Sequence, residues 1–195
     1  MRAAALLCAP LVLAGAAIGN ATGGDGPTGP AIVRVGGGPA GVATGFVVSP
    51  GRVVTVAHLL DGDTVAVRGG GGVERSGTVL RRDDTLDLAL LAVPGLRSAP
   101  AFRHAGTHML VHRNGEVIAE PARVVRRISA RIRAAGAAGV ARRPALELAA
   151  VPTAGDSGAP VLSDGRLAGV LFARSSERAG VAYAIDAAAL DAFLR

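Results

Sequence analysis

Cysteine is almost absent from this chain of 195 residues, since Cys8 is the only one. A single cysteine excludes an intramolecular disulfide, so the folded state must be held together by packing alone. Aromatic residues are also scarce: there is no tryptophan, one tyrosine and four phenylalanines. The core must therefore be built from valine, leucine, isoleucine and alanine, which a domain of this length can supply without cross-links.

Lysine is missing altogether, and all 21 basic residues are arginines, against 15 acidic residues. Seven of the arginines gather between residues 123 and 143. No aromatic side chains are interleaved with them for base stacking, so we expect no nucleic-acid partner. We interpret the segment as a solvated face, with attraction of anionic polymers or lipids as the alternative.

The only long apolar run stands at the amino-terminus, where Met1-Arg2 is followed by apolar and small residues up to Ile18. This run is too short to span a membrane comfortably and is typical of a secretory signal peptide. We expect a signal peptide at residues 1–21, a flexible leader at 22–31 and one folded domain at 32–195. The protein would then be secreted, or lie in the periplasm or cell envelope. An uncleaved anchor that keeps it close to a membrane is the alternative.

Beyond residue 31, short apolar runs alternate with glycine, proline and aspartate, which is the pattern of an all-β fold. Asn114-Gly115 and Asp164-Gly165 predict tight hairpin turns. The alanine-rich end, from residue 185 or 186 to 194, predicts a short helix. The alternation itself fits a barrel or a sandwich equally well.

Three histidines recur every four residues, at His104, His108 and His112. On a helix they would share one face and could bind a metal ion. Gly106 and the strand-like segment 109–111 interrupt such a helix, so we predict no metal site. We also expect no cofactor.

The segment 153–160, Thr-Ala-Gly-Asp-Ser-Gly-Ala-Pro, surrounds Ser157 with small residues and glycines just before an apolar run. An ordinary turn can have the same composition. A serine hydroxyl becomes a nucleophile only with a base in hydrogen-bond reach, a group that orients the base, and donors for the developing oxyanion. His58, at the end of another apolar run, is the candidate base.

The acid that would orient His58 has three candidates, Asp83, Asp84 and Asp87. The first two follow a pair of arginines in a polar stretch that is typical of an exposed turn. Asp87 opens the apolar run 88–93, so its carboxylate can be held at the edge of the core. We therefore choose Asp87.

Three motifs occur in the order His, Asp, Ser: Thr-Val-Ala-His at 55–58, Asp87 before a hydrophobic strand, and Gly-Asp-Ser-Gly at 155–158. In these motifs and this order the sequence resembles the chymotrypsin-like (trypsin-type) serine proteases. The resemblance extends from about residue 32 to 185 and is closest to bacterial HtrA-like and actinobacterial periplasmic serine proteases.

This resemblance implies two antiparallel β-barrels with the active site in the cleft between them, and a short C-terminal helix. It implies Ser157 as the nucleophile, His58 as general base and then acid, and Asp87 as the group that fixes the imidazole tautomer. The backbone N–H groups of Gly155 and Ser157 would form the oxyanion hole. The expected activity is that of an exported serine endopeptidase that cleaves proteins or peptides through an acyl-enzyme. A catalytically silent homologue that binds peptides or envelope polymers is the alternative.

Two residues depart from the family pattern, because Val56 stands where alanine is commoner and Ala159 replaces the second glycine after the serine. Ala159 would harm the site only if its backbone needed a positive φ. Ile32 could supply a new amino-terminus that pairs with Asp156, as in activated zymogens, although a first β-strand explains Ile32 equally well.

The resemblance also implies which residues contact the substrate: Val151, Pro152, Phe172, Ala173 and Arg174. No acid stands at position 151, so a preference for arginine or lysine is not expected. Small or apolar substrate side chains are the prediction, while Arg174 leaves room for acidic ones. The sequence predicts no oligomeric state.

Overall fold

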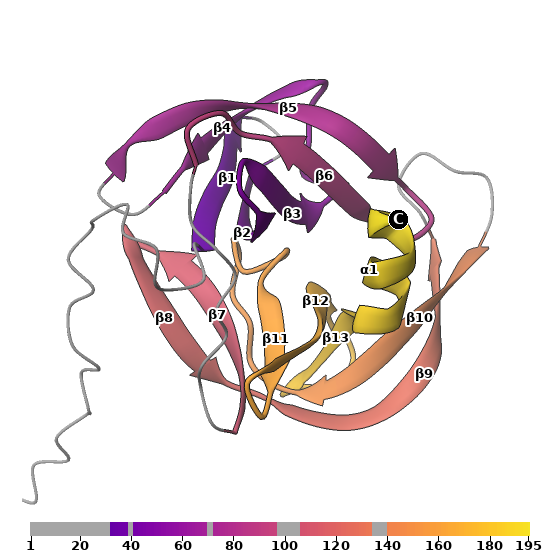
Figure 1. The fold of residues 1–195 in the computed structure, drawn as a ribbon. Coiled ribbons are helices and arrows are strands. Elements are labelled where there is room, and N and C mark those ends of the chain that lie inside the picture. The colour runs from indigo at the N-terminus through magenta and orange to yellow at the C-terminus, as the bar shows by residue number, and fades with distance from the viewer. Residues whose placement is uncertain (1–31, 39–40, 70–71, 97–105, 134–139) are drawn as a thin grey trace, which may run out of the picture.

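The computed structural model describes residues 32–38, 41–69, 72–96, 106–133 and 140–195 (Figure 1). The expected signal peptide and leader, and His104, lie outside these residues. The elements are β1 (Ile32–Gly38), β2 (Gly41–Ser49), β3 (Arg52–Val56), β4 (Thr64–Arg68), β5 (Glu74–Asp83), β6 (Leu88–Ala92), β7 (Thr107–Arg113), β8 (Glu116–Pro121), β9 (Arg123–Arg133), β10 (Val140–Ala149), β11 (Pro160–Ser163), β12 (Arg166–Arg174), β13 (Val181–Asp186) and α1 (Ala187–Leu194).

The first six strands form a closed antiparallel barrel in the order β1-β2-β3-β6-β5-β4. β1 closes it by pairing with β4, where Val35 lies opposite Val67. Closure excludes the sandwich alternative for this half of the chain. The buried hydrophobic side chains of the barrel are aliphatic apart from Phe46, and two threonines, Thr44 and Thr55, are buried among them.

Strands β7 to β13 form one seven-stranded antiparallel sheet in the order β8-β7-β11-β12-β13-β10-β9. The sheet curves under the barrel (Figure 1). Its outer strands, β8 and β9, are not hydrogen-bonded to each other within the described residues, so this half is a curved sheet there rather than a closed barrel. The expected all-β architecture with a C-terminal helix is confirmed.

The predicted hairpin turns are present at both positions. Asn114 and Gly115 have φ of 52° and 87°, and Asp164 and Gly165 have φ of 50° and 74°. Two successive residues with positive φ are what a type I′ turn needs, which is why asparagine or aspartate followed by glycine occupies both.

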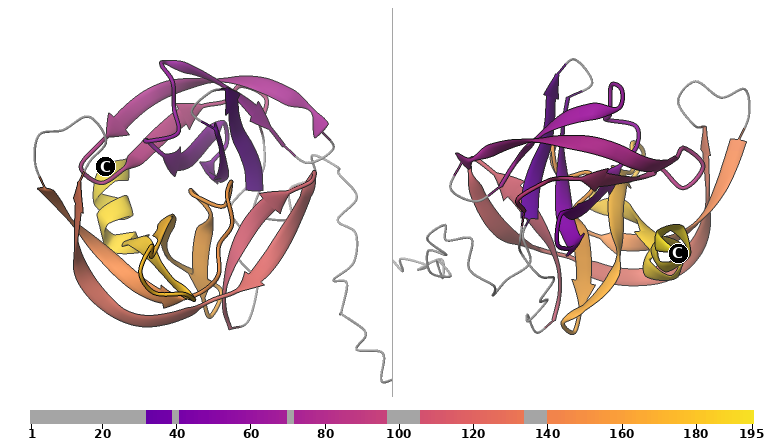
Figure 2. Two further views of the ribbon diagram at one scale, coloured as in Figure 1. Left: turned by 180° about the vertical axis from the view of Figure 1, so that it is seen from behind. Right: turned by 45° about the horizontal axis from the view of Figure 1, so that its top comes forward.

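One hydrophobic cluster runs through both halves, from Phe46 and Leu91 in the barrel to Leu162 and Ile185 in the sheet, and a second lies within the sheet around Met109 and Leu148. α1 packs against β12, β13 and β6, so it bridges the halves (Figure 2). Asp186 begins the helix, because its Oδ1 accepts a hydrogen bond of 3.0 Å from the Ala188 N–H. No helix in the described part of the chain is long and apolar enough to cross a membrane.

Candidate active site

His58 and Asp87 are joined by two hydrogen bonds at the rim of the barrel. His58 lies just beyond β3 and Asp87 just before β6, and the pairing of β3 with β6 brings them together. His58 Nδ1 donates to Asp87 Oδ2 over 2.8 Å, and the His58 backbone N–H donates to Oδ1 over 2.9 Å. With Nδ1 as the donor, Nε2 has a free lone pair and can accept a proton.

The two neighbouring aspartates make other contacts. Asp83 Oδ1 accepts a hydrogen bond of 2.8 Å from the Leu86 N–H, and Asp84 Oδ1 accepts one of 2.6 Å from Arg82 Nε. Asp83 thereby closes the turn after β5, and Asp84 lies in an exposed ion pair. Of the three candidate acids, only Asp87 is hydrogen-bonded to His58 in the structure.

Asp87 has an uncommon backbone conformation, with φ of 63°. Aspartate tolerates this left-handed region better than most residues, but it still carries strain of the kind that gathers at functional sites. Its backbone carbonyl accepts a hydrogen bond of 3.2 Å from Ala57, and its side chain is fixed by His58. Asp87 is 7% exposed, so its carboxylate is shielded from water.

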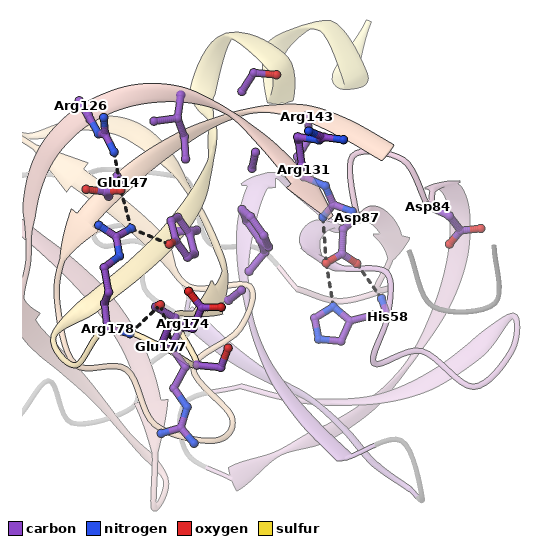
Figure 3. A pocket seen from close by; sticks show the side chains of 18 of the residues that line it. His58, Asp84, Asp87, Arg126, Arg131, Arg143, Glu147, Arg174, Glu177 and Arg178 are labelled. Atoms are coloured by element: carbon purple, nitrogen blue, oxygen red, sulfur yellow. Dashed lines mark hydrogen bonds and ion pairs between the residues drawn. The ribbon is translucent and has the colours of Figure 1, made fainter. Parts of the chain in front are cut away.

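Arg143 brings a positive charge to the same carboxylate from the other half of the molecule. Its Nη1 lies 3.3 Å from Asp87 Oδ2, and its guanidinium lies 5.0 Å from the centre of the Phe172 ring (Figure 3). The side chain is buried, and neither Nε nor Nη1 makes a hydrogen bond to the described residues. The contact with Asp87 is therefore an ion pair without an aligned hydrogen bond, and it ties β10 to the rim of the barrel.

Thr44 of β2 anchors the loop that carries Ser157. The Thr44 N–H donates to the Ser157 carbonyl over 2.8 Å, and its hydroxyl donates to the Gly155 carbonyl over 2.9 Å. Thr44 is completely buried, and its own carbonyl accepts a hydrogen bond of 2.8 Å from the Thr55 hydroxyl. Thr44 of the barrel thus fixes Gly155 and Ser157, the residues directly before and after Asp156.

The backbone of this loop needs glycine at two positions. Gly155 and Gly158 have φ of 96° and 91°, and a Cβ atom at Gly158 would lie 2.0 Å from the Thr44 carbonyl oxygen. Ala159 is not among the residues with positive φ, so the alanine that departs from the family pattern causes no strain of this kind. The N–H groups of Gly155 and Ser157 donate to no described residue, which leaves both available to a ligand.

Ser157, Gly155 and His58 line one cavity of about 630 Å³. Ser157 is half-buried, and its side chain makes no hydrogen bond to His58 within the described residues. Catalytic hydrogen bonds are often long in ligand-free enzymes and tighten only when substrate binds. The cavity is large enough for a peptide segment to reach the serine and both amides at once.

Asp156, next to Ser157, is held by Arg113. Arg113 Nε donates to Oδ1 over 2.9 Å and Nη2 to Oδ2 over 2.5 Å, while Nη1 donates to Glu120 over 2.5 Å. Thr153 adds two further donors to Asp156 Oδ2, at 2.7 and 3.2 Å. Hydrogen bonding to the completely buried Asp156 carboxylate raises the pKa of Arg113.

These contacts replace the amino-terminal pairing considered for Ile32. Ile32 lies buried in β1, opposite Phe46 of β2, and the Asp156 carboxylate is occupied by Arg113 and Thr153. In this structure β-strand pairing places Ile32 in the barrel wall, which is the first-strand alternative. A side chain supplies the positive charge that the buried carboxylate needs.

His112 of β7 lines the same cavity as Ser157. It is 6% exposed, and neither ring nitrogen has a hydrogen-bond partner among the described residues. Burial lowers the pKa of His112 from its ordinary value of 6.5, and the positive charges of Arg34 and Arg68 lower it further. The neutral imidazole is therefore the form that the folded protein prefers.

The stability of the protein should consequently fall in acid because of His112. A histidine whose pKa is lower in the folded state binds fewer protons there than in the unfolded state, so its contribution is complete above pH 6.5 and is lost as the pH falls below that value. Urea unfolding of wild type and His112→Gln at pH 7.5, 6.5 and 5.5 measures the effect. We expect the free energy of unfolding to change with pH more steeply in the wild type than in the variant, by up to about 1.4 kcal/mol per pH unit. Parallel slopes would show that His112 does not titrate differently on folding.

The residues predicted to contact substrate fall into two groups. Phe172, Ala173 and Arg174 line a second cavity of about 890 Å³, which also contains His58, Asp87 and Arg143. Val151 is 74% exposed, Pro152 is buried, and neither lines this cavity or the one at Ser157. The structure thus brings the β12 residues, and not the residues at 151 and 152, next to the candidate catalytic pair.

Two of the three histidines considered for metal binding lie on a strand. His108 and His112 belong to β7, and within the described residues no group of three or more histidine, cysteine or acidic side chains could hold a metal ion. His104 is outside those residues.

Sequence reasoning misses Thr44, Arg113 and Arg143. A cation facing Asp156 was considered only as an amino-terminus at Ile32, and nothing in the sequence distinguishes Arg113 from the other arginines. Thr44 has no motif of its own, because its role comes from a contact with residues more than a hundred positions away.

Comparison with known proteins gives consistent matches. The family model described as the trypsin-like peptidase domain matches residues 43–170. Two curated proteins of Mycobacterium tuberculosis, serine protease Rv3671c of strain H37Rv and serine protease MT3772 of strain CDC 1551, are each 31% identical over 156 residues, which cover 74% of this chain and 39% of theirs. The chain thus spans about two fifths of the length of the curated relatives it matches.

Solved structures show the same relationship. The active form of the Rv3671c protease has a TM-score of 0.75 at 28% identity, covering 85% of this chain and 79% of that one. Its inactive form has a TM-score of 0.70 at 29% identity, with coverage of 85% and 87%. The MamO protease domain from Magnetospirillum magneticum, at 24% identity and a TM-score of 0.67 over 85% of this chain and 96% of that one, shares the fold.

Proposed function

This chain belongs to the trypsin-like peptidases, within the chymotrypsin-like serine proteases, and we propose that it is an exported serine endopeptidase. Its catalytic residues are Ser157, His58 and Asp87, and its substrates are proteins or peptides. The observation that carries the proposal is the meeting of two separate parts of the chain at one cavity, where the hydrogen-bonded His58–Asp87 pair faces the loop of Ser157.

The proposed reaction has two halves. His58 Nε2 takes the proton of the Ser157 hydroxyl while Oγ bonds to the carbonyl carbon of the peptide, and the carbonyl oxygen becomes an oxyanion. His58 then gives the proton to the leaving amine as the C–N bond breaks, which leaves an acyl-enzyme. Water attacks this ester with His58 again as base, and Ser157 regains its proton when the acid product departs. No metal or cofactor takes part.

The surrounding residues have supporting roles in this proposal. Asp87 holds the imidazole with Nδ1 protonated and stabilises the imidazolium that forms when Nε2 accepts the proton. The N–H groups of Gly155 and Ser157 donate to the oxyanion. Thr44 and Arg113 hold these two amides in place through the carbonyls beside them and through Asp156.

Export is the second element of the proposal. It depends on the signal peptide at residues 1–21 and the leader at 22–31, which would deliver the domain 32–195 to the periplasm, the cell envelope or the medium. An uncleaved anchor would place the same domain close to a membrane.

A fluorophosphonate probe tests the catalytic proposal, because it forms a covalent bond only with an activated serine hydroxyl and releases fluoride. We expect the folded wild-type protein to be labelled, and Ser157→Ala to be unlabelled. His58→Ala should label at a rate at least about a hundredfold lower, since the base is missing. Folded wild-type protein that resists the probe at high concentration would favour a silent homologue that only binds peptides.

A further inference from the structure

Charges around the cavity next to His58 are unbalanced, and we propose that this cavity selects substrates with acidic side chains on the flank of the scissile bond that lies along β12. The inference rests on the proposed function and names its substrate class. The walls of this cavity contain six arginines and four acidic residues. They are Arg82, Arg126, Arg131, Arg143, Arg174 and Arg178, and Asp84, Asp87, Glu147 and Glu177.

Most of the arginines are already paired with an acid of the wall. Arg82 binds Asp84 at 2.6 Å and Arg143 lies 3.3 Å from Asp87. Glu147 accepts from two cations, Arg178 at 2.8 Å and Arg126 at 3.2 Å, and these hydrogen bonds lower the pKa of Glu147. His58 and Asp87 lie at one end of the cavity and the Glu147 cluster at the other (Figure 3).

Arg131 and Arg174 differ from the other four. Both are exposed, both line the cavity, and neither has an acidic partner within the described residues. Within the described residues Glu177 is the only acid of the cavity wall that contacts no cation, so at least one positive charge of the wall is left unbalanced. A carboxylate of the ligand is the group that would balance it.

The edge of β12 shows how a peptide can reach these arginines. β12 is hydrogen-bonded on both sides up to Leu171, which exchanges hydrogen bonds with Gly158 and Ala159. At Ala173 and Arg174 the described residues pair with β13 only, so one edge is free. An extended peptide can add to such an edge as a further strand.

A strand added at this edge has side chains that lie about 5 Å from those of its neighbour. A peptide residue opposite Arg174 would therefore have its own side chain within ion-pair distance of the guanidinium. The floor of the cavity is apolar, with Phe172, Ala173 and Tyr183 in contact with the buried core, and it would accept the aliphatic part of a glutamate. Exposed ion pairs each change affinity by up to about fivefold, and a contribution of about threefold from each of the two arginines multiplies to a preference of about tenfold.

Matched peptides test this selection. For each of six consecutive positions around the cleavage site, one peptide carries glutamate and a second, otherwise identical peptide carries glutamine. The values of kcat/KM are compared within each such pair. We expect glutamate to raise kcat/KM by about fivefold to tenfold at one or two positions on one flank at about 20 mM salt, and by less than about twofold at 500 mM, since salt screens exposed charges.

Variants of the two arginines assign the effect. Arg174→Gln and Arg131→Gln should each reduce the glutamate preference by about threefold, and Arg174→Glu should favour an arginine at the same peptide position. Arg166→Gln is the matched control, because Arg166 is an exposed arginine at the other end of β12 and outside the cavity. It should leave the preference unchanged.

Binding to Ser157→Ala separates this inference from the proposed function. Fluorescence anisotropy of the same labelled peptides measures selection without hydrolysis. If the wild type cleaves nothing but Ser157→Ala binds the glutamate peptide more tightly in an Arg174-dependent way, the acid selection stands and the endopeptidase proposal fails. If the wild type cleaves glutamate and glutamine peptides equally at all positions, the selection is overturned and the endopeptidase proposal stands. Neither cleavage nor binding would overturn both.

Discussion

Ser157→Ala is expected to lower kcat/KM for peptide hydrolysis by about a millionfold. In the proposed mechanism the hydroxyl forms the acyl-enzyme, so its removal leaves only the contribution of the oxyanion donors and of substrate binding. The fold should be unaffected, because the hydrogen bonds of residue 157 use its backbone, which alanine retains: its carbonyl accepts from Thr44 over 2.8 Å. Steady-state assays with an internally quenched peptide and thermal unfolding measure the two effects.

Non-additivity is the more demanding part of this prediction. Ser157 and His58 act as a unit, so His58→Ala alone should cost about as much as Ser157→Ala, and the double variant should be no worse than either. Arg142→Ala, which changes an exposed residue of β10, is the control and should retain full activity. A Ser157→Ala protein with more than about a hundredth of wild-type activity would place the nucleophile elsewhere.

Arg113→Met should have the second largest effect, on both stability and activity. The Asp156 carboxylate is completely buried, and without Arg113 it keeps only the donors of Thr153. A buried charge that loses its partner costs about 3 kcal/mol of unfolding free energy. Asp156 lies between the two amides of the oxyanion hole, so movement of its side chain should also lower kcat by about a hundredfold or more.

Two further variants separate charge from packing at Arg113. Arg113→Met combined with Asp156→Asn removes both charges, so it should recover a large part of the lost stability. Arg142→Met removes a solvent-exposed arginine and should change the unfolding free energy by less than about 0.5 kcal/mol. Chemical denaturation and kcat measured on the same samples provide the readouts. Full activity of Arg113→Met would exclude a role for this ion pair in holding the oxyanion loop.

Local patterns predict much of this fold because they have local causes. The turns at 114–115 and 164–165 are specified by two residues each, and the helix from 187 to 194 by its apolar spacing and the cap at Asp186. Barrel closure is different, since β1 and β4 pair through contacts that no local pattern encodes. The same applies to the second half: its curvature, with no hydrogen bonds between β8 and β9 in the part of the chain that the structure describes, has no sequence signature.

The candidate site divides in the same way. Residues that belong to short motifs, His58 and Ser157, are visible in the sequence, and Asp87 can be chosen from three aspartates by the apolar run after it. Arg113 and Arg143 are two of 21 chemically equivalent side chains, and only the tertiary structure shows which of them face a buried carboxylate. The partner of Asp156 has no local signal in the sequence either, because Arg113 lies 43 positions away in the chain.

Thr44 belongs to the barrel that also provides His58 and Asp87, yet the carbonyls it binds belong to the loop of the other half. In the proposed mechanism, a chain that has folded only its first half therefore has a base and an acid but no positioned nucleophile. Under that proposal, newly made molecules would not digest one another before the second half has docked, and hydrolysis would report that assembly is complete.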